Sequence, residues 1–349
     1  MRSMAWRVHH LTMQNLLKPS LSRHLSRRNL LVSAAATSIG AGAHVNAFAQ
    51  SWPARPVKLV VPFAASGPAD NFARFMALRL QEALGQSFVV DNRPGGGGVI
   101  CTDFAAKAAP DGYTLLVMSN AHTVNESLIP NKPYALLRDF VPVAPINSSD
   151  LVLVAHPAVP ANNLREFMAL AKARPGKFNY ASSGPGTPYH MAGELFKAMT
   201  GLFIVHVPYR GSAAARSDLI GGQVDVMFDA VTTMAEFAKS GKVKALATTG
   251  KQRSAALPDV PTVDEAGVKG YESTIWLGLM APRGTPDAVV ARLNEEVSKI
   301  TSSPLVRQAW ARQGAVPLTQ SPAEFARYTQ ADIVKWEKIV KFSGAKAGE

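Results

Sequence analysis

A single cysteine is the first limit that this 349-residue sequence sets. One cysteine closes no intramolecular disulfide, and it excludes CxxC redox motifs and zinc sites built from several cysteines. Cys101 follows a run of glycines, where a small packed side chain is the usual role. Hydrophobic residues make up 47% of the chain and charged residues 18%. These proportions indicate a folded globular protein, and the length favours two domains.

Acidic residues are absent from the first 49 positions. A basic region ending at Arg27 and Arg28 is followed by an uncharged, alanine-rich stretch and then by Ala47-Phe48-Ala49. This order predicts a secretory signal peptide over residues 1–49, and the adjacent arginines resemble a twin-arginine signal. An uncleaved membrane anchor is the alternative, because Leu30–Gln50 carries no charge. We expect cleavage after Ala49 and a mature protein in the periplasm.

A cluster of basic residues is also missing from the mature chain. The formal net charge of +12 falls to +6 without residues 1–49, because the 31 remaining basic residues face 25 acidic ones. They are interspersed with the acids and are not flanked by aromatic residues, so we expect no nucleic-acid partner. The longest apolar run after the signal, Ile275–Pro282, is too short to span a bilayer.

Motifs for several common chemistries do not occur. The glycine run Gly95–Gly98 lies between an expected strand and an expected helix, but it does not match the GxGxxG pattern of dinucleotide sites. The GxxxxGK[ST] loop of nucleoside triphosphate sites, the GxSxG nucleophile elbow and the HExxH zinc motif are all absent. We therefore expect neither a cofactor nor a metal site.

Hydrophobic segments after the signal alternate between strand and helix patterns. Strands are predicted at residues 57–63, 88–90, 113–118, 151–156, 178–182, 204–207, 224–229, 243–248 and 274–281. Helices are predicted between and after them, and Thr187-Pro188 and Ser321-Pro322 with Glu324 mark two helix starts. Short strands that alternate with helices predict an α/β fold with parallel sheets covered on both faces.

Two glycine-containing loops join strand ends to helix starts. The first is Ala64–Asp70, and the second is Ser183–Thr187. Such junctions leave backbone N–H groups unpaired beside the positive end of a helix dipole, an arrangement that suits an anion. The residues alone leave two interpretations open: a clamp for a small carboxylate, or two ordinary strand-to-helix turns.

Eight short motifs, in order, resemble those of the Bug (TctC-like) family. They are WPARPV from Trp52, VPF from Val61 with Gly67 and Asp70, NRPG from Asn92, APDGYT from Ala109, NYASSG from Asn179 with Gly186-Thr187 and His190, HVPYRG from His206, GGQV from Gly221 and LPDVPT from Leu257. Each motif is weak alone, but eight in register over essentially all of residues 50–345 are specific. Members of this family are periplasmic substrate-binding receptors of tripartite tricarboxylate transporter systems.

The resemblance implies an α/β, two-lobed periplasmic-binding-protein fold of the Venus-flytrap type, type II. Lobe one would comprise residues 52–150 and 270–345, and lobe two residues 151–269. The first ligand loop of the family would correspond to Phe63–Asp70 and the second to Gly184–His190. The family commonly has Pro-x-Gly-Gly where this chain has Ala64-Ala65-Ser66-Gly67, so the conformation of the first loop is expected to differ.

The loops and the resemblance together give the candidate ligand-binding residues. They are Phe63, Ala65, Ser66, Gly67, Asp70, Ser119, Asn120, Gly184, Gly186, Thr187, His190 and Asp229. Helix capping is an equal alternative for Ser119, Asn120 and Asp229, and a backbone hydrogen bond is an equal alternative for His190. Neither ligand loop contains a lysine or arginine. We therefore expect backbone N–H groups and the Ser66 and Thr187 hydroxyls to hold the carboxylate, while Arg210 braces its own turn.

The function implied is a monomeric, non-enzymatic receptor that closes its lobes on a small carboxylate and delivers it to integral-membrane transporter subunits. A periplasmic ligand sensor for a two-component system has the same fold and is an alternative that differs in its partner. A periplasmic hydrolase or isomerase with His190 or Asp229 as the base is the alternative from another class, and no activating partner at readable spacing supports it.

Overall fold

The computed structural model describes residues 52–347 of the chain. The signal peptide predicted for residues 1–49 lies outside the described residues and stays a prediction. Within residues 52–347, no helix is both long enough and apolar enough to cross a membrane.

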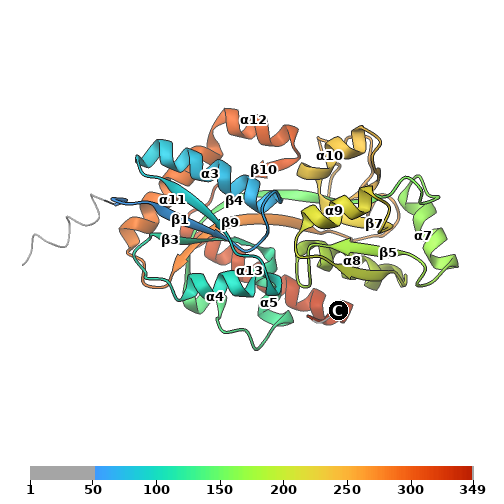
Figure 1. Ribbon diagram of the computed structural model, residues 1–349, viewed down its shortest axis with the longest axis horizontal. Helices are drawn as coiled ribbons and strands as arrows, with labels where there is room; N and C mark the ends of the chain where they lie inside the picture. Colours follow the sequence, from blue (N-terminus) through green and yellow to red (C-terminus); the bar gives the residue numbers. More distant parts are fainter. Residues whose placement is uncertain (1–51, 348–349) are drawn as a thin grey trace, which may run out of the picture. The chain divides into compact units, whose positions relative to one another are not determined.

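Ten strands of the described chain pair in one sheet (Figure 1). The order is β2-β1-β3-β9-β4-β7-β5-β6, and both β8 and β10 also pair with β4. The strands are β1 (Val57–Val61), β2 (Phe88–Asn92), β3 (Thr114–Ser119), β4 (Phe140–Ala155), β5 (Asn179–Ser182), β6 (Val205–Pro208), β7 (Val226–Ala230), β8 (Lys244–Thr248), β9 (Thr274–Pro282) and β10 (Ala315–Pro317).

Strand direction differs between the ends and the centre of the sheet. Strand β1 is parallel to β2 and β3, and β5 is parallel to β6 and β7, as the alternation of strands and helices predicts. Strand β9 is antiparallel to both β3 and β4, and β4 is antiparallel to β7, β8 and β10. The expectation of purely parallel sheets is wrong there, because a buried hydrophobic run indicates burial and not strand direction.

Strand β4 is longer than the sequence pattern indicated. The predicted strand starts at residue 151, whereas the observed strand starts at Phe140. Two prolines, Pro142 and Pro145, weaken the strand signal in the first part, and the register of pairing with β9 shifts next to each of them. The part up to Asp150 pairs with β9, and Leu151–Ala155 pairs with β7 and β8. One strand therefore serves both halves of the sheet.

Helices cover the sheet and mostly begin where the sequence predicted. They are α3 (Pro68–Leu84), α4 (Val99–Ala106), α5 (Asn120–Leu128), α6 (Leu136–Asp139), α7 (Leu164–Ala173), α8 (Pro188–Thr200), α9 (Ser212–Ile220), α10 (Val231–Lys239), α11 (Asp287–Ser302), α12 (Pro304–Arg312) and α13 (Pro322–Ser343), with a short 3-10 turn η1 (Gly96–Gly98). The capping box predicted for Ser321 and Glu324 is confirmed. Helix α5 was not predicted; Ser119 and His122 form its capping box.

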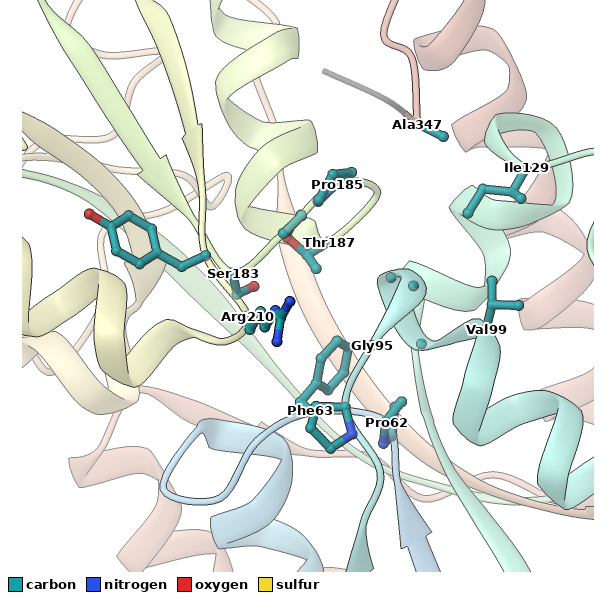
Figure 2. A pocket seen from close by; sticks show the side chains of 16 residues that line it. Pro62, Phe63, Gly95, Val99, Ile129, Ser183, Pro185, Thr187, Arg210 and Ala347 are labelled. Carbon is teal, nitrogen blue, oxygen red and sulfur yellow. Dashed lines mark hydrogen bonds between the residues drawn. The ribbon is translucent and has the colours of Figure 1, made fainter.

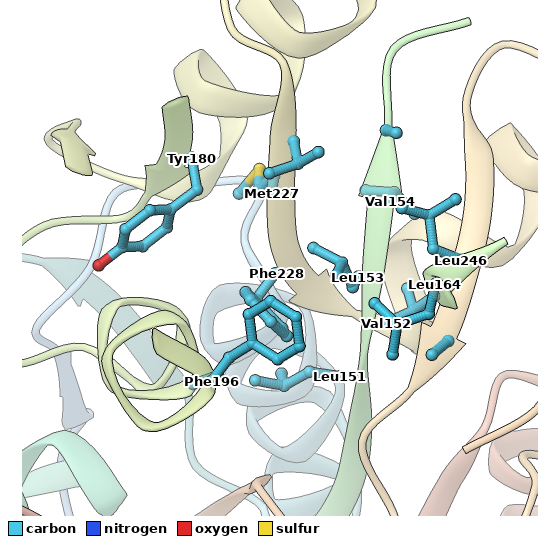
Figure 3. Close-up of a cluster of buried hydrophobic side chains, with 14 of the residues drawn as sticks. Leu151, Val152, Leu153, Val154, Leu164, Tyr180, Phe196, Met227, Phe228 and Leu246 are labelled. Atoms are coloured by element: carbon cyan, nitrogen blue, oxygen red, sulfur yellow. The ribbon is translucent and has the colours of Figure 1, made fainter. Parts of the chain in front are cut away.

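Buried hydrophobic side chains form separate clusters in the two halves of the sheet. One cluster surrounds the second part of β4, where Leu151 and Leu153 pack with Phe196 of α8 and Phe228 of β7 (Figure 3). Another cluster lies between strands β1, β3 and β9 and helices α3 and α11. Trp276 of β9 is 1% exposed and packs edge-on against Phe325 and Tyr328, so it belongs to the core.

Candidate functional site

The first loop connects β1 to α3, and one carboxylate organises it. The buried Asp70 carboxylate accepts hydrogen bonds from the backbone N–H of Ser66 and from Nε of Arg74, both at 3.0 Å. Ser66 has a φ of 66°, in the left-handed region that side chains disfavour. The hydrogen bond to Asp70 holds Ser66 in that conformation, so Asp70 fixes the backbone of the loop.

The charge state of Asp70 follows from these contacts. Burial raises the pKa of the carboxyl group, but hydrogen bonds from Arg74 and from the Ser66 amide outweigh that effect, and the net pKa is lowered. Asp70 is therefore ionised at neutral pH. Because Arg74 already neutralises it, Asp70 adds no net negative charge where the loop opens.

The second loop, between β5 and α8, satisfies most of its own polar groups. The Gly184 amide donates to Oγ of Ser182 at 3.1 Å, and the Gly186 amide donates to Nδ1 of His190 at 3.1 Å. The Thr187 hydroxyl donates to the Gly184 carbonyl oxygen at 2.6 Å. The sequence suggested that these amides and this hydroxyl are unpaired, whereas in the structure they stabilise the loop.

His190 is one of the groups that hold this loop. It is 1% exposed and stacks on His206 with 4.3 Å between ring centroids. Burial, together with His206 and Lys197, lowers the pKa of His190 to about 3. The ring is therefore neutral, with Nδ1 as the acceptor for Gly186 and the hydrogen on Nε2. This geometry matches the backbone hydrogen bond that was the alternative to a ligand contact.

The two loops meet at a cavity of about 20 Å³. Its wall contains the first residues of three helices: Pro68 and Ala69 of α3, Pro188 and Tyr189 of α8, and Ser212 of α9. No side chain caps the N-terminus of any of these three helices. By contrast, side chains of Ser119, Asn163 and Ser321 cap α5, α7 and α13.

Three helix dipoles therefore point their positive ends at one small space. Its lining residues are all uncharged: Phe63, Ala64, Gly67, Pro68, Ala69, Ser183, Pro188, Tyr189, Ser212 and Ile275. First-turn N–H groups without a side-chain cap form an anion-binding environment. The acidic residue in the first turn of α3, Asp70, is paired with Arg74. The sequence patterns indicated ligand loops at the starts of α3 and α8, but they did not indicate that the start of α9 joins them. Gly211, with a φ of 144° before the helix, was the available signal.

A larger cavity of about 400 Å³ lies beside the small one (Figure 2). Its wall includes Pro62, Phe63, Gly95–Gly98, Ser183, Gly184, Pro185, Thr187, Tyr209 and Arg210. Phe63 and Ser183 line both cavities, which are therefore adjacent. The glycine run, which fits no nucleotide motif, thus forms one wall of a cavity. Arg210 was expected only to brace its turn; it lies on the wall of the same cavity.

Four of the predicted site residues line these cavities: Phe63, Gly67, Gly184 and Thr187. Ala65, Ser66, Asp70, Gly186 and His190 lie in or beside the two loops but are not part of either wall. A Cβ atom on Gly186 would lie 2.8 Å from Oδ1 of Asn125, so this glycine permits contact with α5.

The other three predicted residues line neither cavity and stabilise the scaffold. Ser119 accepts a hydrogen bond from the Ala121 amide at the start of α5, and Nδ2 of Asn120 donates to the Thr274 carbonyl oxygen at 2.9 Å. Asp229 is fully buried and forms an ion pair with Arg216 at 3.0 Å. Ser119 caps α5, as its capping alternative suggested, whereas the Asn120 side chain caps no turn and instead bonds to β9.

The described residues provide no arrangement of three or more His, Cys, Asp and Glu side chains suited to a metal ion. Cys101 is fully buried, and burial raises the pKa of its thiol to about 12. A buried thiol with so high a pKa is a poor nucleophile.

Comparison with known proteins relates this geometry to a family. The family described as "Tripartite tricarboxylate transporter family receptor" matches residues 72–345. Protein BugT of Bordetella pertussis is 39% identical over 300 residues, which cover 85% of this chain and 92% of BugT.

Solved structures match over nearly their whole length. R. palustris Rpa4515 with adipate has a TM-score of 0.82 and 37% identity, and the match covers 84% of this chain and 99% of that one. The periplasmic binding protein BugD has a TM-score of 0.81, 36% identity and coverage of 84% and 99%. MatC from Rhodopseudomonas palustris with bound malate has a TM-score of 0.79, 35% identity and coverage of 83% and 100%. These matches confirm the expected two-lobed α/β fold.

Proposed function

The chain belongs to the receptor family of the tripartite tricarboxylate transporters, whose solved members include periplasmic binding proteins, and we propose that it binds a small carboxylate between its two loops. The bound carboxylate is delivered to integral-membrane subunits of a transporter. Binding takes place in the periplasm and involves no covalent chemistry.

One observation carries this proposal: three helix N-termini without side-chain caps converge on a cavity that has no acidic lining residue. A carboxylate there receives hydrogen bonds from first-turn N–H groups of α3, α8 and α9. Each charge-assisted hydrogen bond contributes roughly 1.5–3 kcal/mol, and each helix dipole roughly 0.3–1 kcal/mol. Related receptors carry adipate and malate, both carboxylates, in their solved structures.

The size of the small cavity requires motion. A volume of about 20 Å³ holds about one water molecule and not a carboxylate with its carbon chain. We propose that residues 52–150 with 270–345 form one lobe, that residues 151–269 form the other, and that the lobes separate to admit the ligand. The separate hydrophobic clusters support this division, since the buried residues of one cluster, apart from Tyr271 and Ile275, fall within residues 151–269, and another cluster is built around β1, β3 and β9.

The enzymatic alternative receives no support from the two candidate bases. Nδ1 of His190 accepts a hydrogen bond from Gly186, and the Asp229 carboxylate is paired with Arg216 in the interior. Neither group is among the residues that line the small cavity, and both are held by partners in the scaffold.

Calorimetric titration of a panel of mono- and dicarboxylates against their primary amides tests the proposal. The panel includes adipate and malate. Conversion of the bound carboxylate to an amide removes its charge and places an N–H donor against backbone donors. We expect more than about a hundredfold weaker binding, equivalent to more than ~3 kcal/mol. Equal affinity for acid and amide would contradict the proposal.

Two further measurements separate binding from catalysis and test the lobes. Recovery of unchanged ligand after incubation, measured by NMR, is expected of a receptor, whereas conversion of the ligand would support the enzyme. Small-angle X-ray scattering should give a smaller radius of gyration with the cognate acid. A constant radius despite proven binding would argue against lobe closure.

A further inference from the structure

The larger cavity contains a cation that the proposed carboxylate site does not use. Arg210 follows β6 and lies on the wall of this cavity, between Ser183 and the glycine run that contains Gly95 (Figure 2). Among the described residues that line the cavity, Arg210 has the only charged side chain. An anion in this space therefore meets a positive group and no negative one.

Arg210 is also without an ion-pair partner among residues 52–347, unlike other arginines near the site. Arg74 pairs with Asp70, Arg93 with Asp91, and Arg216 with Asp229. The carboxylate closest in sequence to Arg210, Asp218, instead accepts a hydrogen bond from the Tyr209 hydroxyl at 2.7 Å. The guanidinium of Arg210 is thus available to a ligand.

The opposite wall is compatible with an anion. It is formed by Gly95–Gly98, whose φ values of 132°, 58°, 63° and 97° all lie in the region that favours glycine. This wall presents backbone without side chains, and the α4 helix that follows has no acidic residue in its first turn. An anionic group bound near Arg210 therefore meets no repulsive charge on this side.

The two cavities share Phe63 and Ser183, so one ligand can extend from the small cavity into the large one. We infer that Arg210 binds a second carboxylate at the far end of the ligand and selects dicarboxylates over monocarboxylates. This inference rests on the proposed function, which places the first carboxylate at the three helix starts. The planar guanidinium can donate two parallel hydrogen bonds to that second carboxylate.

The test combines two variants with paired ligands. Calorimetry measures the affinities of wild type, Arg210→Ala and Arg210→Lys for paired ligands. One pair is adipate and hexanoate, and the others are each dicarboxylate that binds and its half-amide. We expect Arg210→Ala to weaken dicarboxylate binding by about tenfold or more while the monoacid or half-amide changes by less than about twofold. Arg210→Lys should keep part of the preference for dicarboxylates, because lysine retains the positive charge but cannot donate two parallel hydrogen bonds.

Arg307→Ala is the matched control for a change in overall charge. Arg307 is an exposed arginine on α12, outside both cavity walls, and its removal should leave both affinities unchanged. Because Arg210 is exposed, the Arg210→Ala protein should melt like wild type.

The outcomes separate this inference from the proposed function. If wild type binds dicarboxylates and Arg210→Ala leaves the ratio of dicarboxylate to monoacid affinity unchanged, the role of Arg210 is overturned while the receptor function stands. If no carboxylate in the panel binds to wild type, the proposed function fails, and the inference fails with it.

Discussion

Gly97 lies directly against the carbonyl group of Pro185. A Cβ atom on Gly97 would be 2.8 Å from that oxygen, closer than real Cβ atoms approach a backbone oxygen. The two residues belong to segments far apart in the sequence, the glycine run after β2 and the loop before α8. Asn125 strengthens the junction, since its Nδ2 donates to the Gly97 carbonyl oxygen at 3.0 Å. The approach of the two segments therefore depends on the absence of a side chain at position 97.

Replacing Gly97 with alanine should weaken ligand binding by about tenfold or more, because the methyl group prevents this approach in the closed arrangement. Gly85→Ala is a matched control: Gly85 has a φ of 70° against 63° for Gly97, but nothing lies within 4 Å of its Cβ position. Both variants should lose about 1–2 kcal/mol of stability from the left-handed backbone. Calorimetry should find reduced affinity in Gly97→Ala alone. Equal affinities in the two variants would show that the contact does not contribute to binding.

Ser66→Gly should stabilise the protein. Ser66 has a φ of 66°, at a position where related receptors commonly have glycine, and a non-glycine residue there costs about 1–2 kcal/mol. The greater freedom of glycine in the unfolded chain offsets part of this gain, so we expect a net increase of about 0.5–1 kcal/mol. Urea denaturation monitored by circular dichroism measures the change. A loss of stability would mean that the Ser66 side chain makes a compensating contact.

Arg216→Ala should destabilise the protein by about 3–5 kcal/mol, because it leaves the buried Asp229 carboxylate without its cation. The side chains of Arg216 and Asp229 are only 12% and 0% exposed. Arg79→Ala is the control: its pair with Glu82 lies on the surface of α3 with exposures of 46% and 51%, so its removal should change stability by less than about 1 kcal/mol. Similar melting temperatures for the two variants would contradict this assignment.

His190 should make stability decrease in mild acid. Its pKa is lowered from 6.5 to about 3 in the folded protein, so between these values the unfolded chain binds more protons. The stability is fully present above pH 6.5 and decreases by up to about 1.4 kcal/mol per pH unit as the pH falls through this window. His190→Asn provides an acceptor for Gly186 without titrating, so its unfolding free energy should depend less steeply on pH. Urea titrations between pH 7 and 4.5 give the unfolding free energy of each protein as a function of pH. Parallel dependences for wild type and variant would contradict the role of His190.

The parts of the fold that sequence patterns predicted are those with local signals. Pro188 and Gly201 bracket α8, and Ser321 with Glu324 starts α13, because caps and proline act within a few residues. The position of β9 between β3 and β4 carries no local signal, since a buried run has the same composition beside any neighbour. The first part of β4 was missed because its two prolines oppose the strand pattern.

The sequence likewise predicted the parts of the candidate site that have local signals and missed those that depend on packing. The two loops were identified because glycine before a helix start is visible in the sequence. The convergence of α9 on them was not, since it depends on the packing of segments that are distant in the chain. Asp229 was proposed as a cleft residue. In the structure it pairs with Arg216, because α9 packs Arg216 against the strand β7 that carries Asp229. Spacing in the sequence does not reveal this pair. Arg210 was assigned to its turn because the cavity beside it forms only in three dimensions.

The central place of β9 also affects how the chain assembles during synthesis. Asn120, the first residue of α5 directly after β3, bonds to Thr274 at the start of β9, 154 positions later. While the ribosome translates the intervening segment, the edges of β3 and β4 that later flank β9 have no strand to pair with. The pairing of β3 and β4 through β9 is therefore completed only after most of the polypeptide has been made. Such long-range pairing is intrinsically slow. In that interval the unpaired strand edges are open to aggregation and to chaperones.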